Sequence, residues 1–269
     1  MKLFVVIAFV LSTVSSEKLY PLNPDVPGIV DEGGRITNGN KAKAGQFPYQ
    51  VGLSLQISSN VAFWCGGSLI GNEWVLTAAH CTDRITSVGV YLGSTVRSSS
   101  EVIHAVLSKD IFPHPEWNPA NLRNDIALIK IPSTPYSANI KPVKLPNKSE
   151  SYSTYEGENV IVSGWGKTSD DAIDLATDLQ WARMQVIPNS ICETTFGSSM
   201  VAPSNICIST PKATSPCKGD AGGPLVLASS KVLIGLTSFA SARGCEMGHP
   251  AGFTRIDSYL DWIKDVTGI

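Results

Sequence analysis

Short apolar runs of strand length, separated by turn residues, recur along most of the chain, and this pattern restricts the folds open to it. Nine such runs follow Ile36, at 49–55, 68–70, 74–77, 88–92, 126–131, 160–162, 225–227, 232–237 and 252–254. Many of their residues are β-branched, and 23 Gly and 17 Pro supply turns between them. Because no long helical pattern separates the runs, the sequence predicts an all-β sandwich or barrel.

One helix is expected, at the C-terminus. Tyr259, Leu260, Ile263 and Val266 form an apolar stripe at helical spacing. Asp257 or Ser258 is the expected N-cap, and Gly268 stands near the end of the helix.

The first 35 residues are predicted to lie outside this fold. Residues 1–16 have a charged start at Lys2, an apolar run at 3–11 and small residues at 12–16, which is the pattern of a secretory signal peptide cut after Ser16. The apolar run is much shorter than the roughly 20 residues that span a bilayer. Residues 17–35 are rich in Pro, Gly and acidic residues, as in a linker or pro-segment. We therefore expect a secreted, extracellular protein without a membrane partner.

Composition excludes two other classes. The chain has 21 Lys and Arg against 23 Asp and Glu, so a nucleic-acid partner bound through a broad basic surface is not expected. Hydrophobic residues make up 43% and charged residues 16%, which argues against intrinsic disorder.

Six cysteines, an even number, favour disulfide bonds in an exported protein. Their spacing leaves all 15 possible pairings open. No pair has CxxC spacing and no CxxH run occurs, so the sequence predicts no metal site, and we expect no cofactor.

Three segments stand apart as candidates for chemistry. His80 ends an apolar run beside Cys81, Asp125 begins another apolar run, and residues 218–224 (KGDAGGP) form a Gly-rich loop. Alone, each has a structural explanation: a core histidine, a residue that begins a strand, or a tight turn. Their order and spacing together are specific.

With these segments the chain resembles the trypsin/chymotrypsin family of secreted serine endopeptidases, and is similar to its insect chymotrypsin-like and collagenase-like members. The resemblance runs from Ile36 to the end and includes residues 36–39 (ITNG), 65–69 (CGGSL), 163–166 (SGWG) and 219–224 (GDAGGP). It implies a peptidase domain at 36–269, made of two six-stranded antiparallel β-barrels at roughly 36–140 and 141–255, followed by the C-terminal helix. It also implies three disulfides, Cys65 to Cys81, Cys192 to Cys207 and Cys217 to Cys245.

The resemblance assigns catalytic roles and exposes one departure from the family. His80 matches the general base and Asp125 the carboxylate that orients it, whereas Ala221 occupies the position of the nucleophilic serine. A methyl group cannot attack a carbonyl, so the chain is expected to be inactive as a peptidase. The N–H groups of Gly219 and Ala221 are expected to retain an oxyanion hole, because that hole needs no hydroxyl.

The resemblance also implies activation by cleavage. A trypsin-like protease would cut between Arg35 and Ile36, and the new amino group of Ile36 would pair with Asp220. The chain would then be a zymogen.

Four residues are expected to form the specificity pocket by the same resemblance: Ser215, Ser238, Ala240 and Ala251. Ser215 stands where trypsins have aspartate, so a preference for apolar side chains before the scissile bond is expected.

Two hypotheses remain open. In the first, the chain is an inactive homologue whose cleft binds peptides, protein substrates or protease inhibitors. In the second, it is an active endopeptidase whose serine has been changed in this copy. The Asn147-Lys-Ser149 pattern allows N-glycosylation or an unmodified loop equally.

Overall fold

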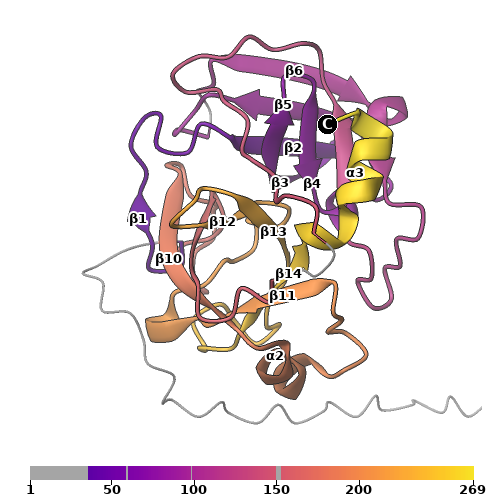
Figure 1. The fold of residues 1–269 in the computed structure, drawn as a ribbon. Helices are drawn as coiled ribbons and strands as arrows, with labels where there is room; N and C mark the ends of the chain where they lie inside the picture. The colour runs from indigo at the N-terminus through magenta and orange to yellow at the C-terminus, as the bar shows by residue number, and fades with distance from the viewer. Residues whose placement is uncertain (1–35, 59, 98, 150–152) are drawn as a thin grey trace, which may run out of the picture.

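Two β-rich units stack on each other in the computed structural model, with the C-terminal helix α3 (Leu260–Thr267) along one side (Figure 1). The structure describes residues 36–58, 60–97, 99–149 and 153–269. The expected signal peptide, pro-segment and Arg35 lie outside the described residues.

The first unit is a seven-stranded antiparallel sheet. Its strands run in the order β6-β5-β2-β3-β4-β8-β7. Side chains such as Leu53, Val75 and Val90 fill its interior and are fully buried. The bounds of the strands are β2 Gln50–Ser58, β3 Val61–Gly71, β4 Trp74–Thr77, β5 Ser87–Leu92, β6 Val102–Leu107, β7 Ile111–Pro113 and β8 Ala127–Lys130.

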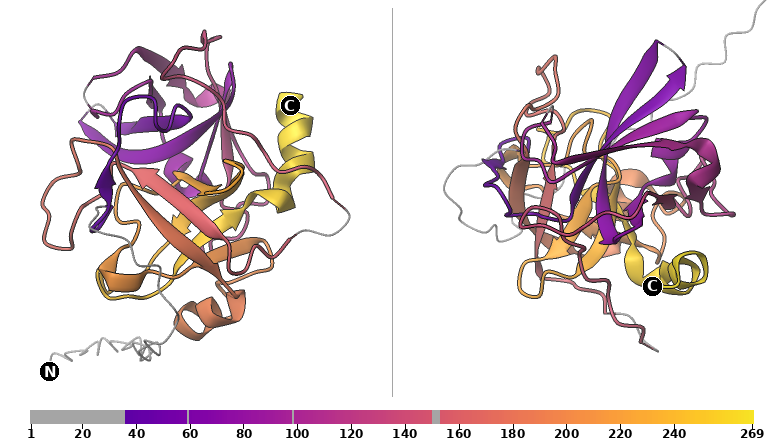
Figure 2. Two further views of the ribbon diagram at one scale, coloured as in Figure 1. Left: turned by 60° about the vertical axis from the view of Figure 1, so that its left-hand side comes forward. Right: turned by 90° about the horizontal axis from the view of Figure 1, so that it is seen from above.

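The second unit is a closed barrel of six strands. The ring β10-β11-β14-β13-β12-β9 is completed by the pairing of β9 with β10, and β1 adds to β10 from outside. The bounds are β1 Asn40–Lys41, β9 Asn159–Gly164, β10 Gln180–Ile187, β11 Asn205–Ile208, β12 Pro224–Leu227, β13 Leu233–Phe239 and β14 Ala251–Arg255. Strand β1 therefore pairs with the second unit, although the strands that follow it in sequence, β2 to β8, form the first unit (Figure 2).

The predicted fold class is confirmed, since each of the nine expected runs overlaps a strand of two antiparallel barrel-like sheets and a helix follows. The first sheet differs in one respect: it has seven strands, and its end strands β6 and β7 are not paired with each other in the described part of the chain. It is thus an open half-barrel, whereas the second sheet closes.

Short helices complete the fold. They are α1 (Ala79–Thr82), α2 (Asn189–Phe196) and the 3₁₀ turns η1 (Ser108–Asp110), η2 (Pro211–Ala213) and η3 (Ile256–Tyr259). The expected N-cap of the C-terminal helix is wrong: Asp257 and Ser258 lie within η3, and α3 begins after Tyr259 without a side-chain cap. Gly268 does end the helix, with a left-handed φ of 78°. No helix of the described residues is long and apolar enough to cross a membrane.

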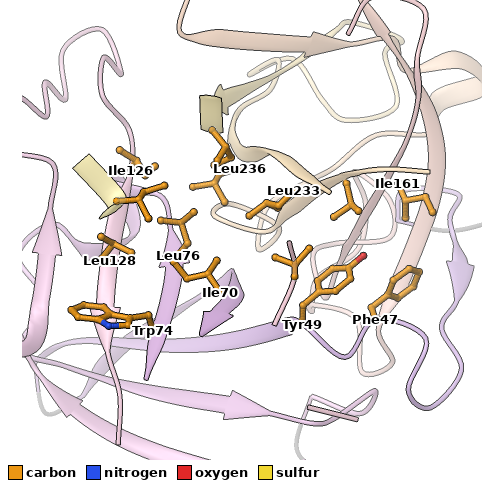
Figure 3. Packing of buried hydrophobic residues seen from close by; sticks show 14 of the residues in the cluster. Phe47, Tyr49, Ile70, Trp74, Leu76, Ile126, Leu128, Ile161, Leu233 and Leu236 are labelled. Carbon is orange, nitrogen blue, oxygen red and sulfur yellow. The ribbon is translucent and has the colours of Figure 1, made fainter. Parts of the chain in front are cut away.

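An apolar layer joins the two units (Figure 3). Trp74, Leu76 and Leu128 contribute to it from the first sheet, and Leu233 and Leu236 from the second. Leu76, Leu128, Leu233 and Leu236 are fully buried. Because burial of apolar surface favours association, this layer holds the two units together. The candidate site lies across that contact.

Candidate active site

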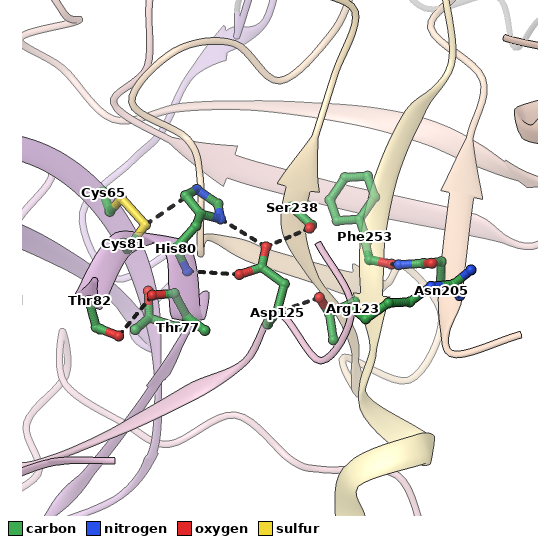
Figure 4. A network of polar contacts seen from close by, with 12 residues as sticks. Cys65, Thr77, His80, Cys81, Thr82, Arg123, Asp125, Asn205, Ser238 and Phe253 are labelled. Atoms are coloured by element: carbon green, nitrogen blue, oxygen red, sulfur yellow. Dashed lines mark hydrogen bonds and ion pairs between the residues drawn. A yellow bond between two sulfur atoms is a disulfide. The ribbon is translucent and has the colours of Figure 1, made fainter. Parts of the chain in front are cut away.

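Strand pairing brings the histidine and the aspartate of the candidate site together. His80 lies in α1, directly after β4, and Asp125 lies just before β8. The two strands are antiparallel neighbours, with Thr77 opposite Ala127. His80 Nδ1 and Asp125 Oδ2 are 2.8 Å apart, and the backbone N–H of His80 donates to Oδ1 at 2.9 Å (Figure 4). Two contacts therefore fix the orientation of the imidazole on the carboxylate.

The second barrel supports Asp125. The Ser238 hydroxyl donates to Oδ2 at 2.6 Å, and the Thr254 hydroxyl donates to the backbone carbonyl of Asp125 at 2.7 Å. The carboxylate is fully buried. Sequence reasoning placed Ser238 only in the pocket and did not identify Thr254. Nothing distinguishes Thr254 from other strand residues in the sequence.

Three effects act on the pKa of His80, one of which lowers it and two of which raise it. Burial lowers it, while the hydrogen bond to Asp125 and the negative charge of that carboxylate raise it. The second pair of effects prevails, so the pKa of His80 lies above its ordinary value. This is the behaviour that a general base needs when it accepts a proton and becomes an imidazolium.

The Gly-rich loop packs against the first unit beside this pair. The N–H of Gly66 donates to the carbonyl of Ala221 at 2.7 Å. Gly222 has a φ of +74°, and a Cβ there would lie 2.1 Å from Thr77 Oγ1, so only glycine fits this contact. The N–H groups of Gly219 and Ala221 donate to no acceptor in the described part of the chain. They remain available to an external oxyanion.

No hydroxyl of the described residues contacts Nε2, the other ring nitrogen of His80. Among the described residues, the one polar contact of His80 Nε2 is with Cys81 Sγ, 3.8 Å away. The side chain at 221 is a methyl group. The arrangement thus has a histidine held on a buried carboxylate, with no hydroxyl of the described residues at its second ring nitrogen.

A cavity of about 430 Å³ opens beside Ala221. Ser238 and Ala240, two of the four expected pocket residues, line it together with Phe239. The other two, Ser215 and Ala251, are buried and do not line it. The Ser215 hydroxyl donates to the carbonyl of Pro216 at 2.9 Å.

Phe239 is a lining residue that sequence reasoning missed. Its ring packs on β14 at Gly252, where a Cβ would lie 2.2 Å from ring carbons. The only sequence signal for this contact is a glycine inside a strand.

Asp220 is fully buried next to this loop. Its carboxylate accepts the N–H of Gly166 at 2.7 Å and that of Cys217 at 2.9 Å. Burial raises the pKa of Asp220 to about 6, although the two hydrogen bonds act in the opposite direction. None of the ion pairs among the described residues includes it. Ile36, the first described residue, is also buried, with 1% of its surface exposed.

Three disulfides cross-link the described part of the chain: Cys65–Cys81, Cys192–Cys207 and Cys217–Cys245. The first joins β3 to α1 next to His80, and the third joins two sides of the cavity. Two groups of possible metal ligands gather around these bonds. In both groups the cysteines are oxidised, and a disulfide sulfur is not the thiolate that binds metals.

Comparison with known proteins places this geometry in a family. Residues 36–263 match the protein family described as Trypsin. A collagenase from Hypoderma lineatum is 45% identical over 236 residues, which cover 88% of each chain. Serine protease 1 from Drosophila melanogaster is 45% identical over 241 residues, covering 90% of this chain and 89% of its own.

A brachyurin from Leptuca pugilator is 36% identical over 236 residues, covering 87% of this chain and 99% of its own. A solved structure titled HL collagenase superposes with a TM-score of 0.80 at 44% identity, covering 86% of this chain and 98% of its own. Fold, sequence match and the paired histidine and aspartate agree, and the chain belongs to the trypsin family of chymotrypsin-like serine protease homologues.

Proposed function

We propose that this chain is a secreted zymogen of the trypsin family that is cut after Arg35 and then binds peptides or protease inhibitors without hydrolysing them. The observation that carries the proposal is Ala221, a methyl group at the position of the nucleophilic serine. His80 Nε2 has no hydroxyl within hydrogen-bond distance in the described part of the chain. Without an oxygen nucleophile, no acyl-enzyme can form.

The rate of peptide hydrolysis is expected to be almost completely lost relative to a chain with serine at position 221. Removing the serine of subtilisin lowers kcat by about 10⁶-fold, leaving only substrate binding and oxyanion stabilisation. Those two functions are independent of the missing hydroxyl. The free N–H groups of Gly219 and Ala221 and the cavity beside them support retained binding.

Cleavage after Arg35 is supported by the setting of Asp220. A fully buried carboxylate with a pKa of about 6 lacks a compensating cation. Thr37, next to Ile36, donates its N–H to the carbonyl of Ser215 at 3.1 Å, which holds the start of the domain near the Asp220 loop. A new α-amino group at Ile36 would provide the missing charge.

The pocket supports ligands with small or aromatic apolar side chains. Its lining near Ala221 includes Ala240 and Phe239. Its one lining carboxylate, Asp170, is exposed and accepts the N–H groups of Cys245 and Glu246, so no buried carboxylate is available to attract Arg or Lys. One relative is named a collagenase and another a serine protease, and extended protein chains are therefore the expected ligands of this cleft.

The test compares the unaltered chain with its Ala221→Ser variant. Both zymogens are cut with immobilised trypsin, which is removed by filtration, and assayed on peptides with Phe, Leu or Ala before the scissile bond. We expect hydrolysis only from Ala221→Ser, and its loss in the double variant Ala221→Ser/His80→Ala. Hydrolysis by the unaltered chain would refute inactivity. Failure of Ala221→Ser would show that the cleft has lost more than its nucleophile.

A further inference from the structure

A second cavity, of about 760 Å³, lies on the C-terminal unit and shares no lining residue with the cavity beside Ala221. It is bordered by the segment before β9, the end of β10, the turn before β11 and the end of β14. Two arginines line it, Arg123 and Arg255, with Glu156 as its one lining carboxylate.

Arg255 is held in place at the wall of this cavity. Only 7% of its surface is exposed. Its Nε donates to the carbonyls of Pro203 and Asn205, both at 3.2 Å, and Nη1 donates to the carbonyl of Ser153 at 2.9 Å. The guanidinium also lies 5.8 Å from the centre of the Tyr155 ring. These contacts fix its position without supplying a carboxylate partner.

Arg123 approaches the same cavity from the other unit, two residues before Asp125. Its Nη2 donates to the carbonyls of Ser198 and Ser199 at 3.4 and 3.1 Å. In Figure 4 its side chain extends away from the His80–Asp125 pair. Ligand binding to Arg123 would therefore leave the catalytic pair uncovered.

The charge of this cavity is positive. Neither arginine takes part in an ion pair among the described residues, and both donate only to backbone carbonyls. Carbonyl groups are dipoles and do not neutralise a guanidinium. Two carboxylates act on the pKa of Arg255 by their charge, Asp257 and, to a smaller extent, Glu156. Asp257 accepts the Tyr155 hydroxyl at Oδ1 and does not line the cavity, whereas Glu156 does, so two guanidinium charges face one lining carboxylate.

We propose that this cavity binds a sulfated sugar chain. A guanidinium presents paired N–H donors that match a sulfate oxyanion, and sulfate stays ionised at every physiological pH. Ser153, Thr154, Ser204 and Ser258 add hydroxyls to the lining, which suit sugar oxygens. A volume of about 760 Å³ is far larger than one inorganic ion requires. This surface would anchor the secreted protein to sulfated matrix, whether or not the cleft is catalytic.

The test uses the full secreted chain and a heparin octasaccharide as the probe, with binding measured by calorimetry at low and physiological salt. Arg123→Gln should weaken binding by about tenfold, because one charge-assisted contact is lost. Arg183→Gln removes an exposed arginine of β10 outside the cavity and serves as the matched control, with less than about twofold change expected. Arg255→Gln should also weaken binding, and its fold is checked by thermal unfolding.

Three results would overturn the proposal. Equal weakening by Arg123→Gln and Arg183→Gln would mean a diffuse charge effect. Inorganic sulfate that binds as tightly as the octasaccharide would mean a site for a single ion. Tighter binding of a polyglutamate peptide than of the octasaccharide would mean an acidic-peptide site.

Discussion

Cutting the chain after Arg35 should stabilise the folded protein at neutral pH, because the cut relieves a buried charge. In the uncut chain, burial raises the pKa of Asp220 from 3.8 to about 6. That difference corresponds to about 3 kcal/mol in the free energy of unfolding. A carboxyl group whose pKa is raised by folding favours the folded state fully below pH 3.8, and this contribution is lost as the pH rises to about 6.

The new amino group of Ile36 should remove this penalty by pairing with the carboxylate. The gain on cutting is then largest at pH 7, about 3 kcal/mol, and shrinks towards pH 4, where Asp220 is protonated in the uncut chain. For a domain of this size, 1 kcal/mol corresponds to about 2–4 °C in Tm, so an increase of about 6–12 °C is expected at pH 7.

Scanning calorimetry of the cut and uncut protein at pH 7 and pH 4 measures this difference. The control is Arg35→Gln, which trypsin cannot cut at this bond and which should show no increase. Asp220→Asn should abolish the pH dependence of the gain. An increase of equal size at both pH values, or one that persists in Arg35→Gln, would refute the pairing of Ile36 with Asp220.

Three further results follow from the geometry. By NMR titration the ring of His80 should lose its proton above pH 6.5, since its pKa is raised, and a midpoint below 6.5 would contradict the charged partner. Gly222→Ala should destabilise the fold by at least about 2 kcal/mol through its clash, whereas Gly157→Ala, with a similar φ of +79° and nothing within 4 Å, should cost about 1 kcal/mol in chemical denaturation. Replacing both cysteines of Cys192–Cys207 by alanine should lower the free energy of unfolding by about 2–4 kcal/mol, and an unchanged denaturation midpoint would argue against that bond.

Much of this protein could be predicted from local sequence alone. Each strand was predicted from a short apolar run, and the C-terminal helix was predicted from the helical spacing of the apolar residues between Tyr259 and Val266. The proposed inactivity is also a local inference, because a methyl group at position 221 cannot act as a nucleophile whatever its neighbours are.

Contacts between distant segments needed the tertiary structure. Thr254 bonds to Asp125 across 129 residues, and Ser238 bonds to it across 113, with no spacing rule to reveal either. Ser215 and Ala251 matched pocket positions by resemblance, and the structure shows that both are buried and are not among the residues lining the cavity beside Ala221.

The sequence by itself determined the strands, the helix, the oxidised state expected of the cysteines and the methyl group at position 221, because propensity, periodicity and functional-group chemistry act within a few residues. The cysteine pairing was implied by the family resemblance and is found in the structure. Only the tertiary structure decided that the first sheet stays open, how deeply Asp220 is buried and that Arg123 and Arg255 share a cavity. Those outcomes depend on burial and electric fields created by residues far apart in the chain, and such fields exist only once the two units have packed together.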